Sequence, residues 1–298
     1  MSSPGPGAAE APDTTRDTNR ADGVVVARRG PALLVGLDRP AKHNALDEAT
    51  VARLHAVLAD ARREPCVVVV HSTTPGVFAA GADIAELLER DAADALRGIN
   101  SGLMDALEAH PWPTVAAVDG PALGGGCELA LACDLRVGSP RARFGQPEPG
   151  LGIIAGAGAN WRLPQVVGLP RARRMLYTGE VLDAEAAERA GLLDAVHPAE
   201  KLLDAAVGLA EQIATRSWRA LELTKMALRV HRPATTGFDL LAQSVLFEDP
   251  EKRERMSAFL AERDRRRQER AERRAREADA AGSGGGDEPV SRPDGARG

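Results

Sequence analysis

The sequence lacks the features that mark several large classes of protein. Its three cysteines, Cys66, Cys127 and Cys133, lie in apolar runs without paired spacing. This excludes a disulfide framework or a zinc ribbon and favours a reducing compartment. No run of 18 apolar residues could span a membrane, and the N-terminus lacks the apolar core of a secretory signal. A net charge of −5 argues against a generally basic nucleic-acid binder. We therefore expect a soluble, cytoplasmic protein.

Several common catalytic motifs are also missing. The six histidines are scattered and form no HExxH or His/Cys cluster, so no metal site is expected. Neither the phosphate-binding GxxxxGK[ST] nor the nucleophile-elbow GxSxG is present. The stretch GLGIIA, residues 150–155, matches the dinucleotide pattern GxGxxA. The residues before it, QPEP, are not a buried strand, which argues against a dinucleotide site.

The chain divides into four parts by composition. Residues 1–22 have no apolar periodicity and are predicted to form a disordered tail. A catalytic core is expected over residues 23–200, followed by a helical region over 201–267. Residues 268–298 are predicted to extend the last helix with charged residues and then to become disordered.

The order of predicted elements indicates an α/β layer fold. A hairpin is expected over residues 24–37, buried strands over 66–71 and 114–118, and a helix from Asp47 to about 63. Further helices are expected from about residue 82, over 92–109 and from near Gly124. Beyond Leu163 the pattern is almost wholly helical, over 171–178, 184–190, 199–215, 217–231, 238–248 and 250–276.

The stretch GPALGGGCELALACD, residues 120–134, places three glycines at the start of a predicted helix. Unpaired backbone N–H groups at a helix N-terminus attract negative charge, and glycines leave those groups bare. Glu128 lies one turn inside the helix, on roughly the same face as Gly124 and Gly125. Donors and a carboxylate would then share one space. The alternative is close helix packing at the glycines and a solvated Glu128.

Two other stretches extend this hypothesis. ARFGQPEPGLGIIAGAG contains Glu148 among few other charges, although a glutamate in such a segment can simply be a loop-surface residue. FAAGADI, residues 78–84, is a second turn of small residues between a strand and a helix. Two such turns can offer two N–H donors to one carbonyl oxygen. Two carboxylates can act as an acid and a base.

These stretches together resemble the crotonase, or enoyl-CoA hydratase, superfamily. LDRPAKHNALD is similar to an early coenzyme A loop of that family, and KRERMSAFLAERDR to its C-terminal helix. The resemblance covers roughly residues 24–267. It implies a spiral of ββα units with a C-terminal helical region used in trimer assembly, and a homotrimer or a dimer of trimers.

The resemblance also implies roles for individual residues. The N–H groups of Ala82 and Gly125 would hold the oxygen of an acyl-CoA thioester, and Glu128 and Glu148 would hold one water between them. Having both glutamates favours hydration. Binding of coenzyme A and substrate would involve Lys42, Ala80, Asp83, Ile84, Ala85 and Gly156. Coenzyme A is part of the substrate here, and no metal or redox cofactor is expected.

The expected reaction is the reversible syn addition of water to a trans-2-enoyl-CoA. One alternative is a double-bond isomerase in which Glu148 alone shuttles a proton. Departures from the family pattern bear on the substrate rather than the fold, and they occur at Pro149, Gly150, Ala155, Ala159, Asn160 and Trp161. Arg255 stands where the family often has glycine.

The charged stretch ERDRRRQERAERRARE, residues 262–277, offers a different class of function. Acids are interleaved with the basic residues and no aromatic side chain is present. This pattern is typical of a solvated, salt-bridged helix. RNA binding would lack side chains on which bases could stack. A protein that keeps the fold and uses this tail to bind RNA or a partner is therefore the less favoured alternative.

Overall fold

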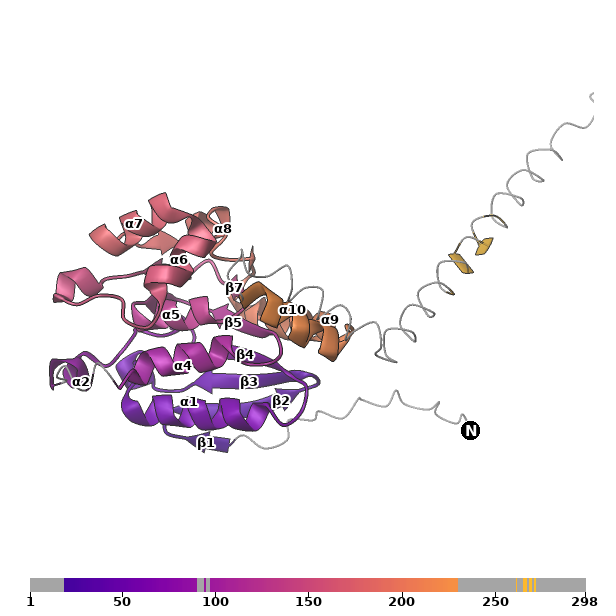
Figure 1. Ribbon diagram of the computed structural model, residues 1–298, viewed down its shortest axis with the longest axis horizontal. Coiled ribbons are helices and arrows are strands. Elements are labelled where there is room, and N and C mark those ends of the chain that lie inside the picture. The colour runs from indigo at the N-terminus through magenta and orange to yellow at the C-terminus, as the bar shows by residue number, and fades with distance from the viewer. Residues whose placement is uncertain are drawn as a thin grey trace, which may run out of the picture. The chain divides into compact units, whose positions relative to one another are not determined.

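The computed structural model describes residues 19–89, 94, 97–229, 261, 265–266, 268–269 and 271. The chain forms two compact units, residues 1–235 and 236–298, and the architecture below is that of the first (Figure 1). This unit extends past residue 200, where the sequence placed the start of a helical region, because the helices that follow pack on the sheet. The predicted helix over 238–248 lies outside the described residues, as does most of that over 250–276.

The main sheet has seven strands in the order β1-β2-β3-β4-β5-β7-β10. The first three form an antiparallel meander, and the remaining strands add in parallel. Their bounds are β1 Asn19–Ala21, β2 Val24–Arg29, β3 Ala32–Leu37, β4 Val67–Ser72, β5 Thr114–Val118, β7 Leu135–Gly138 and β10 Ala195–Val196. The parallel-rich sheet with its covering helices confirms the α/β part of the predicted fold, and the use of the C-terminal helices in trimer assembly stays a prediction. The prediction of a disordered tail over residues 1–22 is wrong for residues 19–21, because they pair with β2.

A second, small sheet contains strands that the sequence did not predict. It has the order β6-β8-β9, with bounds Pro121–Leu123, Arg143–Gly145 and Leu182–Asp183. Strands of two or three residues show no measurable alternation of apolar and polar positions. Their pairing is set by the tertiary fold, and β6 and β8 frame the glycine turn.

The helices agree with the predictions where they are long. Asp47 caps α1 by accepting a hydrogen bond from the Thr50 N–H at 2.9 Å, as its sequence position predicts. The stretch before Leu163 was not predicted to be helical, but α6 begins there at Ala159. The bounds are η1 Pro40–Lys42, α1 Glu48–Ala61, α2 Ile84–Glu89, α4 Ile99–Glu108, α5 Gly125–Ala132, η2 Glu148–Leu151, α6 Ala159–Val167, α7 Leu169–Thr178, α8 Ala184–Arg189, η3 Ala199–Lys201, α9 Leu202–Ala214 and α10 Trp218–Arg229.

Both faces of the main sheet are buried, which explains the unbroken apolar runs of β4 and β5. Val68 and Val70 face a core shared with α1, α4 and α5. Val67 and Val69 face a second core shared with α9. Because β4, β5 and β7 are parallel, their carboxyl ends lie at one edge of the sheet, where the loops after β4 and β5 begin. Among the described residues, no helix has the length and apolar character needed to cross a membrane.

Candidate active site

The loops that follow β4 and β5 run side by side. Ala79 and Ala122 form a parallel bridge, in which the Ala79 N–H donates to the Pro121 oxygen at 3.1 Å. The Leu123 N–H returns a bond of 3.2 Å to the Ala79 oxygen. This pairing brings the two predicted small-residue turns together, although they lie about 40 residues apart in the sequence.

The two predicted oxyanion donors are neighbours at the far end of these loops. A Cβ atom on Gly125 would lie 3.3 Å from the Ala82 nitrogen, and one on Gly81 would lie 3.2 Å from the Gly125 nitrogen. Gly125 is the first residue of α5, so its N–H has no partner within the helix. Within the described part of the chain, neither this N–H nor that of Ala82 donates to another backbone group. Both are available to one acceptor.

The three glycines before Glu128 meet different demands. Gly124 has φ 50° and ψ −123°, and a Cβ atom there would lie 2.8 Å from Glu148 Oε1. A Cβ on Gly126 would lie 2.0 Å from the Ala79 oxygen, which is a backbone clash. Close packing therefore explains Gly126. Gly124 needs glycine for its backbone conformation and for the approach of Glu148.

Glu128 is 3% exposed, so the solvated alternative for this residue is wrong. Its Oε1 accepts hydrogen bonds from the N–H groups of Ala157 at 2.8 Å and Ala159 at 3.0 Å. Burial raises the pKa of Glu128, and these backbone donors act against that rise because they stabilise the carboxylate. The turn before α6 therefore supplies donors that favour the charged form of Glu128, against a burial that leaves its pKa raised.

Glu148 is 7% exposed, which overturns the loop-surface alternative. Burial raises its pKa to about 7, and the negative charge of Glu128 adds to the rise. One terminal atom of the Gln146 amide lies 3.2 and 3.0 Å from the two Glu148 oxygens. If it is the nitrogen, it donates to a carboxylate; if it is the oxygen, it accepts from a carboxylic acid. The structure thus brings both predicted glutamates together, with different partners.

Sequence reasoning missed Arg162, which supports the Glu128 turn from α6. This arginine is 4% exposed, and its Nη1 donates to the Ala157 oxygen at 2.9 Å. Its Nη2 pairs with Glu108 at 2.6 Å and with Asp105 at 2.8 Å, both on α4. The sequence signal that could have indicated Arg162 is its place in the stretch ANWRLP, where a charged residue stands among mostly uncharged ones. A buried cation needs such partners.

The residues predicted to bind coenzyme A and substrate flank these groups on the outside. Lys42 is largely exposed, and its Nζ lies 3.5 Å from Asp83 Oδ2. Ala80, Ile84 and Gly156 are also exposed. Ala80, Asp83 and Ile84 surround Ala82 in sequence, and Gly156 precedes the Glu128 donor Ala157. Ala85 is in α2, but its side chain lies outside the described set.

Comparison with known proteins identifies the family to which this arrangement belongs. The sequence profile described as "Enoyl-CoA hydratase/isomerase" matches residues 30–269. The chain belongs to the enoyl-CoA hydratase/isomerase family. This confirms the resemblance drawn from the glycine and glutamate motifs. The match includes both loops, both glutamates and the residues that flank them.

Members of the enoyl-CoA hydratase/isomerase family are similar over most of their length. The chain is 39% identical to 2,3-dehydroadipyl-CoA hydratase of Escherichia coli, over 80% of this chain and 96% of the relative. It is 34% identical to the short-chain-enoyl-CoA hydratase of Clostridium acetobutylicum, over 80% and 95%. Among solved structures, an enoyl-CoA hydratase from Bacillus anthracis has a TM-score of 0.77 at 30% identity, covering 80% and 96%.

Proposed function

We propose that the protein is an enoyl-CoA hydratase, a hydro-lyase that adds water reversibly to a trans-2-enoyl-CoA. The observation that carries the proposal is the pair of buried glutamates beside two free backbone N–H groups. Relatives named as hydratases, 33–39% identical to the chain, support the same reaction. The substrate class is an acyl-CoA thioester.

The roles of the two glutamates follow from their surroundings. Glu128 accepts two backbone hydrogen bonds that favour its carboxylate, so it acts as the base. Glu148, with its pKa raised to about 7, keeps a proton near neutral pH and acts as the acid. Two carboxyl groups that share one site in this way divide one proton between them.

The reaction balances with these groups alone. Glu128 takes a proton from water, and the water oxygen bonds to C3 of the enoyl group. The C2–C3 π electrons move toward the thioester, whose oxygen becomes enolate-like. The N–H groups of Ala82 and Gly125 stabilise that oxygen, a contribution worth roughly 2.7–4 kcal/mol for each donor. Glu148 then gives its proton to C2, which completes the 3-hydroxyacyl-CoA, and a proton passes from Glu128 back to Glu148 through solvent before the next turnover.

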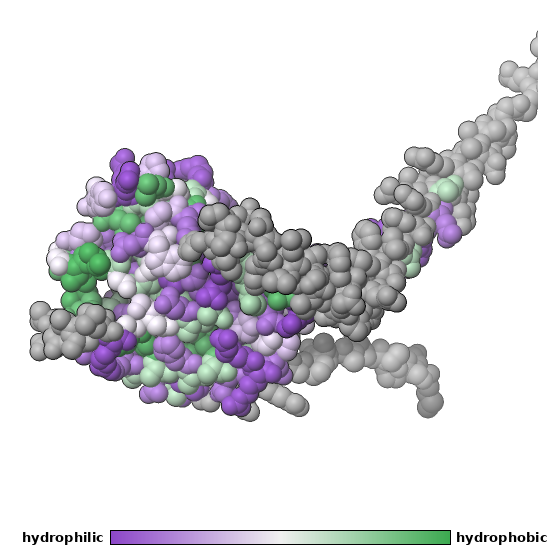
Figure 2. Space-filling view, viewed as in Figure 1, coloured by the Kyte–Doolittle hydropathy of each residue, from purple (hydrophilic) through white to green (hydrophobic). Residues whose placement is uncertain are grey.

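We also propose assembly as a homotrimer or a dimer of trimers. Several large apolar side chains are exposed on the described surface, including Ile154, Tyr177 and Leu228. Figure 2 shows apolar areas separated by hydrophilic ones on one face of the molecule. Apolar side chains at this exposure are typical of surfaces that contact another chain or a ligand.

The direct test is turnover of crotonyl-CoA, followed by loss of the enoyl-thioester absorbance. The expected product is 3-hydroxybutyryl-CoA, identified by mass and chromatography. Movement of the double bond in a longer enoyl-CoA without a gain of water would indicate an isomerase instead. Binding without either reaction would contradict both. A panel of enoyl-CoA chain lengths then defines the preferred acyl group.

A further inference from the structure

We infer that Asp119 is a positioning residue that fixes the oxyanion hole. Its carboxylate holds the loop after β4 against the loop after β5, and these loops carry the N–H groups of Ala82 and Gly125. The inference rests on the proposed function for its effect on rate. Its structural part, the alignment of two donors, can be measured separately.

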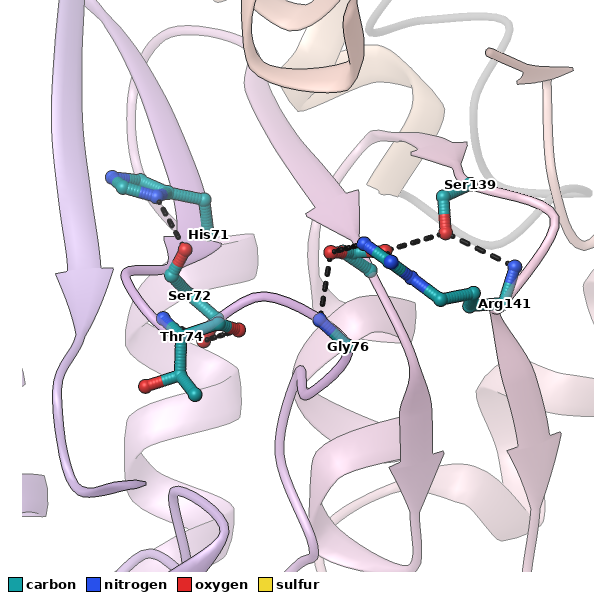
Figure 3. A network of polar contacts seen from close by, with 7 residues as sticks. His71, Ser72, Thr74, Gly76, Ser139 and Arg141 are labelled. Atoms are coloured by element: carbon teal, nitrogen blue, oxygen red, sulfur yellow. Dashed lines mark hydrogen bonds and ion pairs between the residues drawn. The ribbon is translucent and has the colours of Figure 1, made fainter. Parts of the chain in front are cut away.

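The carboxylate of Asp119 joins three segments of the chain. Asp119 directly follows β5, and its Oδ2 accepts from the Gly76 N–H, in the loop after β4, at 2.9 Å. Its Oδ1 accepts from Ser139 Oγ at 2.6 Å. Arg141 binds both oxygens, through Nε at 2.9 Å and Nη2 at 2.6 Å. Figure 3 shows Gly76, Ser139 and Arg141 converging on this point.

The two loops touch backbone to backbone beside this carboxylate. Gly120 has φ +115°, and a Cβ atom on it would lie 2.2 Å from the Gly76 oxygen. No side chain therefore fills the space between the loops here. At this end of the loops, their relative position is held by the bond from Gly76 to Asp119, together with the contact at Gly120.

The alignment set at Asp119 extends to the two donors. From Gly76 and Gly120 the loops run parallel and pair through Ala79 and Ala122. They end at Ala82 and Gly125, whose nitrogens lie close together. Both loops are short and lie against each other, so a shift at one end moves one N–H relative to the other. A misplacement of about 1 Å can cost about 10²-fold in rate.

The charge of Asp119 is maintained by its partners. Burial would raise its pKa, but the hydrogen bonds from Arg141, Gly76 and Ser139 outweigh this and lower the pKa. The Arg141 side chain is 51% exposed, and both residues line a hollow of about 380 Å³. Arg141 can therefore be solvated when the carboxylate is removed. Loss of the carboxylate is expected to disturb the alignment more than the fold.

The test compares Asp119→Asn with Asp204→Asn as a matched control. Asp204 lies in α9 and forms a surface ion pair with Arg29 on β2 rather than with either loop. For Asp119→Asn we expect kcat on crotonyl-CoA to fall about 10- to 100-fold, with KM changed less than about threefold and little change in Tm. Asp204→Asn should match the wild type. Arg141→Lys, which keeps the charge but loses the paired hydrogen bonds, should give a smaller fall in kcat.

A spectroscopic measurement distinguishes positioning from a structural role. Two aligned donors polarise a bound thioester carbonyl, so 2,4-hexadienoyl-CoA should absorb at longer wavelength when bound. Measured at saturation in a Glu148→Gln background, this shift should be reduced by Asp119→Asn and unchanged by Asp204→Asn. A full shift in Asp119→Asn, or a wild-type kcat, would overturn the inference. The inference would also be overturned if bound 2,4-hexadienoyl-CoA showed no absorbance shift in the Glu148→Gln protein that keeps Asp119.

The same measurements separate this inference from the proposed function. If the wild type fails to hydrate crotonyl-CoA but Asp119→Asn still reduces the shift, the hydratase assignment is wrong and the positioning role stands. If Asp119→Asn does not fold, Arg141→Lys decides by the same shift. A folded Arg141→Lys variant with an unreduced shift would then count against the inference.

Discussion

At the scale of single residues, the site depends on two carboxyl groups whose hydrogen-bond partners and pKa values differ. Glu128 accepts hydrogen bonds from two backbone N–H groups of a distant segment, whereas Glu148 faces the Gln146 amide and its own backbone N–H. Burial raises the pKa of both. Backbone donors act against that rise at both residues, through the N–H groups of the turn before α6 at Glu128 and through its own N–H at Glu148. The charge of Glu128 raises the pKa of Glu148 further, so one proton belongs mainly to Glu148 near neutral pH.

The first prediction concerns the pH dependence of hydration. The pKa of Glu148 is raised from 4.5 to about 7, so its acid form predominates below pH 7 and is lost above it. We expect kcat/KM for crotonyl-CoA to fall as the pH rises through about 7. In Glu148→Gln this alkaline limb, the fall in kcat/KM above about pH 7, should be absent. The same variant should lose at least about 10²-fold in kcat. Glu128→Gln should lose a similar factor.

The pH dependence of the activity that remains in Glu128→Gln tests whether the two carboxyl groups interact. Removing the Glu128 charge removes one cause of the raised Glu148 pKa. The alkaline limb should therefore move to lower pH in this variant. An unmoved limb would show that the two carboxyls do not interact, and near-normal hydration by either variant would remove that residue from the mechanism.

The second prediction separates the roles of neighbouring glycines. Gly126→Ala should lower Tm strongly, because its Cβ would lie 2.0 Å from a backbone oxygen. Gly125→Ala should fold, because its nearest contact is 3.3 Å, but should lose about 10²–10³-fold in kcat as the new methyl group crowds the donors. Gly208→Ala, on α9 with no atom within 4 Å, is the control and should keep full activity. Full activity in a folded Gly125→Ala would exclude Gly125 from the site.

At the scale of elements, the sequence predicted what local physics determines. The β5 strand has the bounds that its buried apolar run indicated, and Asp47 caps α1. The short strands β6, β8 and β9 and the start of α6 were missed, because neighbouring chain segments decide their conformation. The same limit applies to the site. Glu128 and Glu148 could be found from their positions, but Asp119 and Arg162 act through residues distant in sequence.

The third prediction concerns the segment that joins α4 to β5. His110 is 1% exposed, and neither ring nitrogen has a hydrogen-bond partner among the residues that the structure describes. Burial lowers its pKa from 6.5 to about 3, with a contribution from the Lys225 charge on α10. The unfolded chain therefore binds a proton more readily than the folded one. The unfolding free energy should fall as the pH drops below 6.5, by up to about 4–5 kcal/mol at pH 3.

Denaturant unfolding at several pH values measures this effect. His110→Phe keeps a ring beside Trp112 and should reduce the loss of stability between pH 6.5 and 4. The control is His197→Gln, at a half-buried histidine, which should keep the wild-type slope. A slope unchanged in His110→Phe would place the acid sensitivity in other groups.

At the scale of the whole molecule, the fourth prediction concerns assembly. Ile154 and Tyr177 are each 74% exposed and Leu228 is 80% exposed, so each is available for contact with another copy of the chain. Three copies of a 31.4 kDa chain would have a mass of about 94 kDa, and six copies would have twice the mass of three, about 188 kDa. Light scattering after size exclusion should give one of these two masses. A mass of one chain would contradict the proposed assembly.

The last prediction concerns the charged C-terminal tail. The family match ends at residue 269, so truncation after residue 268 removes almost nothing that relatives share. Arg265 and Glu269 form an exposed pair one turn apart at 3.8 Å, and such pairs contribute only a few tenths of a kcal/mol. The truncated protein should keep the Tm, mass and hydration rate of the full chain. Binding of a labelled RNA by the full chain alone would instead support the RNA-binding alternative. A fall in mass or rate on truncation would show that the tail takes part in the assembled enzyme.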